Sequence, residues 1–464
     1  MTMKYKRTQQ WKILSNDNRE WWLENQYREK GRIIIDETIK SILESIDSST
    51  PEEILQKNNS VIAAALKNET TATPTISTKE FLNQALKIFA RAGVITPENE
   101  LEQTVGRSSE TKEEPLNQTP LVSVIIVNYN GIEHLPELLD SLKRQDYPNI
   151  ELIIIDNHSR DDSVAFIKDH YKEAAIIINP TNVEHGAAFN MGLKKARGEL
   201  ILHLDNDIVM EADAISRLVR AAQSRKKWAA LAPKLKFYYN RAFINALGNS
   251  IHKTDWGSDN FIYYADLGQF DHFTEPFSAC FGAVLLNREA IEKVGELDDF
   301  YKVYYDDVDW CYRAQINGFH IYNVPLVEFF HKFGGTMKQN NRFHWRKWEL
   351  VISNRLYFTI KNLERRTLLR FLFNYVFEDI KNALGSLLKG RLRFFLIYMK
   401  AYIRFVLAVP RALFKRRRIQ KLRDNVTDAM LFIKIVPINP SVSEGGSPRL
   451  DVPSICANYI NVAK

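Results

Sequence analysis

The sequence predicts an α/β protein with a mostly parallel, doubly wound sheet, a helical N-terminal region and basic amphipathic C-terminal helices. Three observations predict this fold. Short apolar runs alternate with amphipathic segments from residue 121 onward, which is typical of strand–helix–strand units joined by right-handed crossovers. Helix start signals occur upstream of that region, and positive charge is concentrated after residue 360.

Residues 1–102 are expected to be helical because they contain two helix start signals. Ser77-Thr-Lys-Glu80 has the spacing of a capping box, in which the Ser and Glu side chains bond to backbone N–H groups of the first turn. Ser49-Thr-Pro-Glu-Glu53 indicates a second start, since proline is tolerated in the first helical turn. The polar residues 103–120 are then expected to form a linker.

Residues 121–360 are expected to form the α/β domain. Its strands are predicted over residues 121–127, 151–155, 175–178 and 200–204. Its helices are predicted over residues 132–144, 163–171, 186–196 and 306–317. Continuous apolar runs are typical of parallel strands that helices cover on both faces. The carboxyl ends of such strands line one crevice, where α/β proteins bind their ligands.

Two carboxylates, Asp205 and Asp207, follow the apolar run 200–204 and form a D-x-D motif. Such a pair suits Mg²⁺ or Mn²⁺, which keep coordination positions open for substrate phosphates. Each Asp is also an ordinary turn residue after a strand, so the surroundings decide the interpretation. His331 follows the apolar stretch 324–330, and its imidazole could complete a Mn²⁺ site, bond to a phosphate or cap a strand.

Polar residues also follow the first two predicted strands. Asn128, Tyr129 and Asn130 come after the first strand, and Asp156 comes after the second. Taken singly, each is a typical turn residue. Because the strand ends should converge, Asp156 could accept hydrogen bonds from a base or ribose and Tyr129 could offer a stacking face. Together with the D-x-D motif, these residues predict a site for a nucleoside diphosphate.

A second acidic cluster contains Asp306, Asp307 and Asp309, with Arg313 four residues after the last. Three carboxylates this close repel one another unless one is protonated or cations contact them. One of them could act as a general base that deprotonates an attacking hydroxyl. The alternative is an acidic helix start that interacts with its own dipole.

Between Lys361 and Gln420 there are fifteen Lys and Arg against three acidic residues, a net charge of +12 in a chain of net charge +7. Residues 368–388 and 394–414 look amphipathic as well as basic, so the region 361–435 is expected to lie on an anionic membrane surface. The alternative is a basic helical subdomain packed on the body. Nucleic acid is not an expected partner, because no nucleic-acid-binding fold accompanies the charge.

The remaining composition narrows the class of protein. Three widely spaced cysteines offer neither a disulfide framework nor a zinc pattern, and the first thirty residues lack the apolar core of a secretory signal. A cytoplasmic location is therefore expected. No uninterrupted run of about eighteen apolar residues is present, so no transmembrane span is predicted. Residues 436–464, rich in Pro, Ser and Gly, are expected to form a loose tail.

Several of these segments, in this order, resemble glycosyltransferase family 2, particularly its bacterial rhamnosyltransferase-like members. The resemblance covers about residues 120–335. The matching segments are Val124-Ile-Ile-Val-Asn-Tyr-Asn-Gly131, Ile155-Asp-Asn-His-Ser-Arg-Asp-Asp-Ser163, Asn182 with Gly186, Asn190 and Gly192, Leu204-Asp-Asn-Asp207, Gly282-Ala283, Gly295, residues 298–300, and Asp306-Asp-Val-Asp309 with Arg313.

This resemblance implies a GT-A, Rossmann-like fold and an inverting transfer from a nucleotide-activated sugar. Asp205 and Asp207 would handle the metal and the diphosphate, with Mn²⁺ or Mg²⁺ as the cation. Asp306-Asp307 replaces the Glu-Asp pair of the family, which puts Asp307 at the base position. The implied donor-binding residues are Asn128, Tyr129, Asn130, Asp156, Asn182, Gly186, Asn190 and Asp205, and the implied acceptor region contains Gly282, Ala283, Asp309 and Arg313.

The expected donor is dTDP-rhamnose or a UDP-sugar, and the expected acceptor is a glycan or lipid-linked glycan in cell-surface polysaccharide synthesis. The protein would then work at the inner face of the cytoplasmic membrane. The alternative from another class is a non-catalytic scaffold with a degenerate transferase core. A nucleotidyltransferase would normally carry a Gly-rich basic phosphate loop, and a processive synthase would need membrane spans and a Q-x-x-R-W segment; neither pattern is visible.

Overall fold

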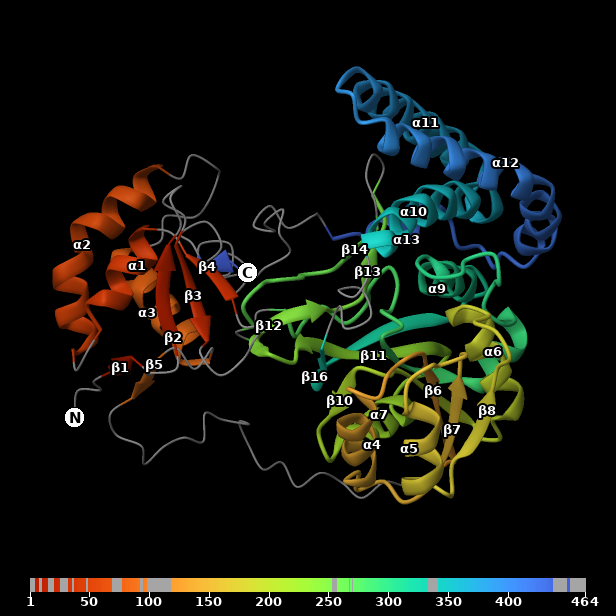
Figure 1. The fold of residues 1–464 in the computed structure, drawn as a ribbon, viewed down its shortest axis with the longest axis horizontal. Helices are drawn as coiled ribbons and strands as arrows, with labels where there is room; N and C mark the ends of the chain where they lie inside the picture. Colours follow the sequence, from red (N-terminus) through yellow and green to blue (C-terminus); the bar gives the residue numbers. More distant parts are fainter. Residues whose placement is uncertain are drawn as a thin grey trace.

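The computed structural model places an N-terminal unit, a central α/β domain and a group of C-terminal helices, which lie at the left, lower right and upper right of Figure 1. It describes residues 5–7, 11–15, 21–25, 32–35, 37–46, 49–68, 77–91, 95–97, 118–252, 257–266, 268, 270–332, 341–436 and 449–450.

The central domain is built on one large sheet with strand order β10-β16-β11-β15-β9-β6-β7-β8, and β12 pairs with β11. Its strands are β6 (Val122–Asn128), β7 (Ile150–Asp156), β8 (Ala175–Ile178), β9 (Leu200–Asp205), β10 (Ile208–Met210), β11 (Trp228–Phe237), β12 (Asn240–Ala246), β15 (Ala283–Asn287) and β16 (His320–His331). The pairs β6–β7, β6–β9, β7–β8 and β11–β16 are parallel. The predicted mostly parallel sheet is confirmed, with β10, β12 and β15 as antiparallel additions.

Helices cover both faces of this sheet. They are α4 (Leu135–Lys143), α5 (Ser163–His170), α6 (His185–Lys195), α7 (Ala214–Gln223), α8 (Arg288–Val294) and α9 (Asp306–Ile316). Along β6, Val124 and Ile126 join the core under α4 and α7, whereas Ile125 and Val127 join the core under α6 and α9. Successive side chains of a strand point to opposite faces, so every position of this apolar strand is buried.

In the N-terminal unit, both predicted helix start signals precede helices, and each start forms a capping box. Its helices are α1 (Glu37–Glu44), α2 (Pro51–Asn68) and α3 (Thr78–Arg91). The backbone N–H of Ser77 donates to Glu80 at 3.0 Å, and that of Thr50 donates to Glu53 at 2.7 Å. Buried side chains of the three helices pack on Phe243 of β12, which joins this unit to the central domain.

The prediction that all of residues 1–102 are helical is wrong for short strands near both ends of this region. The structure has β1 (Tyr5–Arg7) paired with β5 (Ile95–Pro97), and a second sheet of β2 (Trp11–Ser15), β3 (Trp21–Asn25), β4 (Arg32–Ile35) and β17 (Arg449–Leu450). These segments are short and rich in Trp and Ile, residue types that favour strands. Residues 449–450 of the expected loose tail are therefore paired; the rest of that tail beyond residue 436, and linker residues 103–117, lie outside the described residues.

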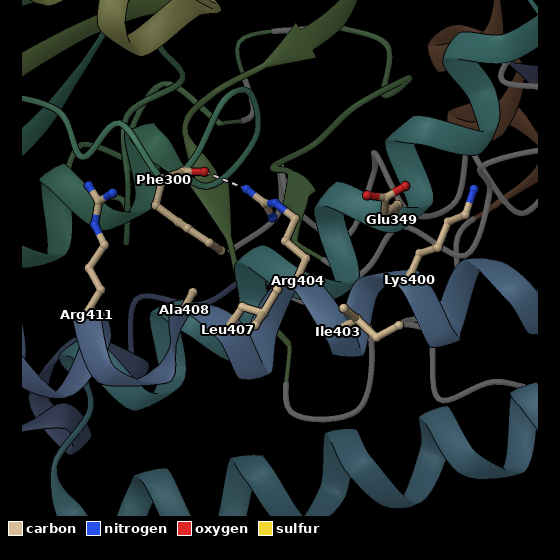
Figure 2. A pocket seen from close by; sticks show the side chains of 8 residues that line it. All are labelled: Phe300, Glu349, Lys400, Ile403, Arg404, Leu407, Ala408 and Arg411. Carbon is tan, nitrogen blue, oxygen red and sulfur yellow. Dashed lines mark hydrogen bonds between the residues drawn. The ribbon is translucent and has the colours of Figure 1, made fainter.

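Helices α10 (Asn341–Asn362), α11 (Arg365–Leu388), α12 (Leu392–Lys421) and α13 (Asp428–Phe432) follow the sheet. Asn354 of α10 donates to the carbonyls of Val303 and Tyr304, at 2.9 and 2.8 Å, just before α9. Arg404 of α12 donates to the carbonyl of Phe300 at 2.5 Å, as Figure 2 shows. The helices thus hold the loop that leads into α9. Among the described residues, none of the helices combines the length and apolar character needed to cross a membrane.

Candidate active site

The D-x-D motif lies where β9 ends, on the edge of the sheet that the sequence predicted. The backbone N–H of Asp205 donates to the carbonyl of Gly282 at 2.9 Å, and the carbonyl of Asp207 accepts from the N–H of Lys332 at 3.0 Å. Because β10 and β16 are paired with Ile208 opposite His331, the imidazole of His331 lies beside the motif.

His331 and the two carboxylates form a possible metal site. Nε2 of His331 lies 3.2 Å from Oδ1 of Asp207, and Asn245 holds the other ring nitrogen at 2.8 Å. The ligand atoms of Asp205, Asp207 and His331 all lie within 4.8 Å of one another. Burial lowers the pKa of His331, but the charge and hydrogen bond of Asp207, together with the charges of Asp205 and Asp259, outweigh it and leave the pKa above its ordinary value. Two carboxylates and one imidazole fit a divalent cation such as Mn²⁺.

Asn128 and Asp156 form a buried network at the ends of β6 and β7. Nδ2 of Asn128 donates to Oδ1 of Asp156 at 3.0 Å, while Nδ2 of Asn206 donates to Oδ1 of Asn128 at 2.9 Å. The backbone N–H of Ser159 donates to the second oxygen of Asp156 at 3.0 Å. A Cβ at Gly131 would lie only 2.1 Å from Oδ1 of Asn128, so this network requires the glycine.

Tyr129 and Asn130 occupy the more open part of the same edge. Tyr129 is half-buried and Asn130 is exposed, with a left-handed backbone at φ 49°. Ser159 accepts from the N–H of Asn130 at 2.9 Å, and the Asn130 side chain accepts from the N–H of Arg160 at 2.8 Å. The loops after β6 and β7 are therefore held together, as expected from convergent strand ends.

Asn182 and Asn190 hold backbone segments of the protein. Oδ1 of Asn182 accepts from Asn157 at 2.9 Å and from the N–H of Glu184 at 2.8 Å. Both side-chain polar atoms of Asn190 bond to the backbone of Leu297, at 2.9 and 3.1 Å. Donor contact was predicted for Asn190, but its polar atoms are taken up by that loop, so its role is positional. Gly186 lies in the first turn of α6 close to Leu297.

Asp306 and Asp307 begin α9. The side chain of Asn249, in β13 (Asn249–Ser250), donates to Oδ2 of Asp307 at 2.5 Å, and the N–H of Val308 donates to its Oδ1 at 2.7 Å. Burial raises the pKa of Asp307 to about 8, and the negative charges of Asp306 and Asp259 add to this effect. A carboxyl with a pKa near neutrality suits a general base.

The chain enters α9 through two left-handed residues. Tyr304 and Tyr305 have φ angles of 65° and 69°, a conformation that bulky side chains rarely adopt. Such strain persists only where the surroundings hold it, and Asn354 of α10 bonds to the carbonyls of Val303 and Tyr304. The C-terminal helices therefore fix the conformation that presents Asp306 and Asp307.

The predicted acceptor residues divide into two groups. Asp309 is fully buried and contacts Lys361 at 2.7 Å and Arg313 at 2.9 Å, so this pair belongs to an internal ion network. The acceptor role predicted for Asp309 and Arg313 is corrected on this ground, because neither side chain is free to meet a substrate. Gly282 lies next to Asp205, whereas Ala283 is buried in β15 opposite Leu204.

Two histidines of this site were not predicted from the sequence. Nε2 of His185, the first residue of α6, lies 3.3 Å from Oδ1 of Asp205, and its Nδ1 lies 3.1 Å from Oδ2 of Asp306. Nε2 of His203, inside β9, lies 3.6 Å from the same Asp205 oxygen. Burial raises the pKa of Asp205, but bonds to His185 and His203 outweigh it and leave the pKa low. The sequence did contain a signal for His203. This residue lies two positions before the first Asp of the D-x-D motif, so the two side chains point to the same side of the strand.

The family model for glycosyl transferase family 2 matches residues 123–295. Residues 123–295 therefore form a glycosyltransferase family 2 segment. The family 2 segment contains the D-x-D motif and the network of Asn128 and Asp156. The predicted GT-A fold agrees with this assignment and with the observed sheet.

Several curated proteins are similar to this chain over part of their length. An uncharacterized glycosyltransferase of Haemophilus influenzae is 39% identical over 101 residues, which are 21% of this chain and 40% of that protein. The putative glycosyltransferase EpsH of Bacillus subtilis is 34% identical over 107 residues, 23% of this chain and 31% of its own. The O-antigen biosynthesis protein RfbC of Myxococcus xanthus is 26% identical over 229 residues, 47% of this chain and 18% of its own. Each alignment thus spans less than half of the relative.

Among solved structures, residues 1–349 of TarS from S. aureus are similar to this chain with a TM-score of 0.42 and 17% sequence identity. That similarity covers 68% of this chain and 90% of the TarS chain.

Proposed function

We propose that this family 2 protein is a metal-dependent, inverting glycosyltransferase that moves a sugar from a nucleoside diphosphate to a hydroxyl of a glycan or lipid-linked glycan. The observation that carries the proposal is the position of His185. It contacts Asp205 at 3.3 Å and Asp306 at 3.1 Å, so the D-x-D motif and the acidic start of α9 belong to one site. A site with phosphate-handling carboxylates next to a high-pKa carboxyl has the parts that sugar transfer needs.

On the donor side, Asp205, Asp207 and His331 would hold the divalent cation. When bound, such a cation supplies charge stabilisation for the departing diphosphate. Asp156 would accept hydrogen bonds from the base or ribose, at the end of β7, which β6 separates from the D-x-D strand β9. Its own carboxylate is held by Asn128 and Ser159, which keeps it in place before the donor arrives.

On the acceptor side, Asp307 would take the proton of the attacking hydroxyl as the anomeric carbon inverts. Asn249 and the N–H of Val308 orient its two oxygens. Asp306, held by His185, keeps a second negative charge nearby, which helps to raise the pKa of Asp307. The inverted configuration follows from a single displacement with the base and the diphosphate on opposite sides of the sugar.

The proposed donor is dTDP-rhamnose or a UDP-sugar, and the proposed setting is cell-surface polysaccharide synthesis. The name of the RfbC relative, an O-antigen biosynthesis protein, supports the setting.

We also propose that α11 and α12 hold the enzyme on the anionic inner face of the cytoplasmic membrane. The two helices contact each other and extend away from the sheet at the top of Figure 1. Their exposed apolar side chains recur every three or four residues, apart from one seven-residue interval between Val406 and Leu413, which makes one stripe on each helix. The stripe of α11 contains Leu369, Phe373, Phe377, Ile380, Leu384 and Leu388, and that of α12 contains Leu392, Leu396, Met399, Ile403, Val406 and Leu413.

Exposed positive charges flank these stripes. They are Arg365, Arg366, Arg370, Lys381, Lys389, Arg391, Arg393, Lys400, Arg411, Arg417 and Arg418. Figure 2 shows a hollow beside α12 in which Ile403 and Leu407 lie between Lys400 and Arg411. An apolar stripe with flanking cations fits the boundary between acyl chains and anionic headgroups.

The test is a calorimetric titration of the whole chain with a panel of nucleoside diphosphate sugars, with and without Mn²⁺. Metal-dependent binding of one donor, lost in Asp207→Ala and kept in Asp169→Ala, is the expected result. Asp169 is an exposed carboxylate of α5 and serves as the matched control. No binding of any donor by a folded protein would overturn the transferase proposal and favour a scaffold.

A further inference from the structure

A second cluster of possible metal ligands lies beside the D-x-D motif. It consists of His185 at the start of α6, His203 inside β9 and Asp205 at the end of β9. The two Nε2 atoms lie 3.1 Å apart, and they lie 3.3 and 3.6 Å from Oδ1 of Asp205. The three possible ligand atoms, which come from α6 and β9, therefore lie close enough together to contact one cation.

These distances fit the edges of a metal coordination shell. A divalent metal with nitrogen and oxygen ligands at ~2.0–2.2 Å holds neighbouring ligand atoms roughly 3–3.6 Å apart. Two imidazole nitrogens and a carboxylate oxygen also form the ligand set that Zn²⁺ and related transition metals prefer over Mg²⁺. We propose that His185, His203 and Asp205 form a second metal site that takes an imidazole-preferring divalent cation such as Zn²⁺.

The surroundings hold the two imidazoles in this arrangement. Nδ1 of His185 lies 3.1 Å from Oδ2 of Asp306, which is the carboxylate–histidine contact that orients metal-bound histidines. His203 is fully buried, and the ring of Phe189 packs edge-on against it with centroids 4.8 Å apart. Both Nε2 atoms are thereby directed to the same place without a change of fold.

This site is distinct from the proposed donor-metal site, although the two share Asp205. Asp207 and His331 complete the donor-metal group, whereas His185 and His203 complete the second group. The second cation would lie next to Asp306, so it would fix the start of α6 against the start of α9. The inference rests on the proposed function only through Asp205, because metal binding by the two histidines can be measured without any donor.

The experiment is a calorimetric titration of the metal-stripped, full-length chain with Zn²⁺ in the presence of millimolar Mg²⁺, which occupies oxygen-rich sites. The wild-type chain should bind Zn²⁺ tightly. His185→Gln and His203→Gln should weaken that binding at least about tenfold, since loss of even an orienting partner weakens metal sites by roughly 10–100-fold. His331→Gln should keep the Mg²⁺-resistant binding, and so should His320→Gln, which alters an exposed histidine.

His203 is buried, so His185→Gln is the decisive variant, with circular dichroism and a thermal melt as the check on folding. A Co²⁺ titration gives a second measurement, because the absorption of bound Co²⁺ reports its ligands and should change in His185→Gln. Zn²⁺ binding by His185→Gln equal to that of the wild-type chain would overturn the proposal and leave only hydrogen bonds between these side chains. Donor binding through Asp207 would be unaffected by that failure.

Discussion

His185 Nδ1 lies 3.1 Å from Oδ2 of Asp306, although the two residues are 121 positions apart in the sequence. The other ring nitrogen, Nε2, lies 3.3 Å from Oδ1 of Asp205. Burial lowers the pKa of His185, but the two carboxylates outweigh this effect and raise the pKa to about 10. In the metal-free chain, a protonated imidazole between them offsets the repulsion that two buried carboxylates would otherwise create, and a cation at the second site would take the place of the proton on Nε2.

Asp307→Asn is expected to abolish transfer while donor binding is kept. The amide preserves the shape of the side chain but cannot accept the proton of the acceptor hydroxyl. A positioned base contributes roughly 10²–10⁴-fold in rate, so kcat should fall by about that factor. Product formation and donor affinity should be measured on the same preparation. Retained transfer with weakened donor binding would assign Asp307 to the donor side instead.

The transfer rate should depend on pH through Asp307. Burial raises its pKa to about 8, so the protonated, inactive form is populated below that pH and kcat/KM should fall as the pH decreases. Asp259→Asn removes a negative charge that raises this pKa, and the midpoint should therefore move to lower pH. A profile measured between pH 6 and 9, about the expected midpoint, tests both statements. A midpoint that does not move in Asp259→Asn would contradict the electrostatic explanation.

The sequence could predict the elements whose signals are local. Residues 175–178 form a strand as predicted, and the capping box at Ser77 is present. Apolar runs and helix starts act over a few residues, so they can be recognised without the fold. The position of Asp205 and Asp207 at a sheet edge also followed from the sequence, because strand ends meet there. For His331 the sequence left three roles open, and the structure places it with the two carboxylates.

Contacts between distant segments could not be predicted in the same way. Asp309 looked like a site residue next to Asp306, but Lys361 of α10 and Arg313 enclose it. Asn190 was predicted to bind the donor, but both of its side-chain polar atoms form hydrogen bonds with the backbone of Leu297. The decisive partner in each case comes from another part of the chain, and one sequence gives no signal for such pairing.

Gly131→Ala should disturb the nucleotide side of the site. A Cβ there would lie 2.1 Å from Oδ1 of Asn128 and 2.3 Å from Nδ2 of Asn206, so the network on Asp156 must shift. Overpacking of this kind costs about 1–3 kcal/mol, and donor affinity should fall with it. Gly385→Ala is the control, since a Cβ in that part of α11 meets nothing within 4 Å and should stabilise by about 0.5–1 kcal/mol. Urea unfolding of both variants distinguishes them, and equal effects would contradict this account.

Lys361→Met should destabilise the junction between α10 and the central domain. Nζ of Lys361 lies 2.6 Å from Asp298 and 2.7 Å from Asp309, and all three side chains are buried. Removing the cation leaves two carboxylates without their main partner, which costs about 3–5 kcal/mol. Lys421→Met, at an exposed lysine of α12, should change the free energy of unfolding little. Similar values for the two variants would show that the buried network does not stabilise this junction.

The paired change Phe373→Ser and Phe377→Ser should release the protein from anionic vesicles. The two rings are 71% and 59% exposed and lie on one face of α11, so they cannot be needed for the core. Insertion of a Phe side chain into an apolar phase is worth about 1.5–3 kcal/mol, which predicts at least about a hundredfold weaker binding for the pair.

Cosedimentation with phosphatidylglycerol vesicles measures this binding, and neutral vesicles should bind less of the wild-type chain because the flanking cations lose their partners. Leu326→Ser, at an exposed apolar residue of β16 in the sheet domain, is the control and should bind as the wild-type chain does. Undiminished binding of the double variant would leave the basic residues alone as the source of attraction, and that binding would then disappear in high salt.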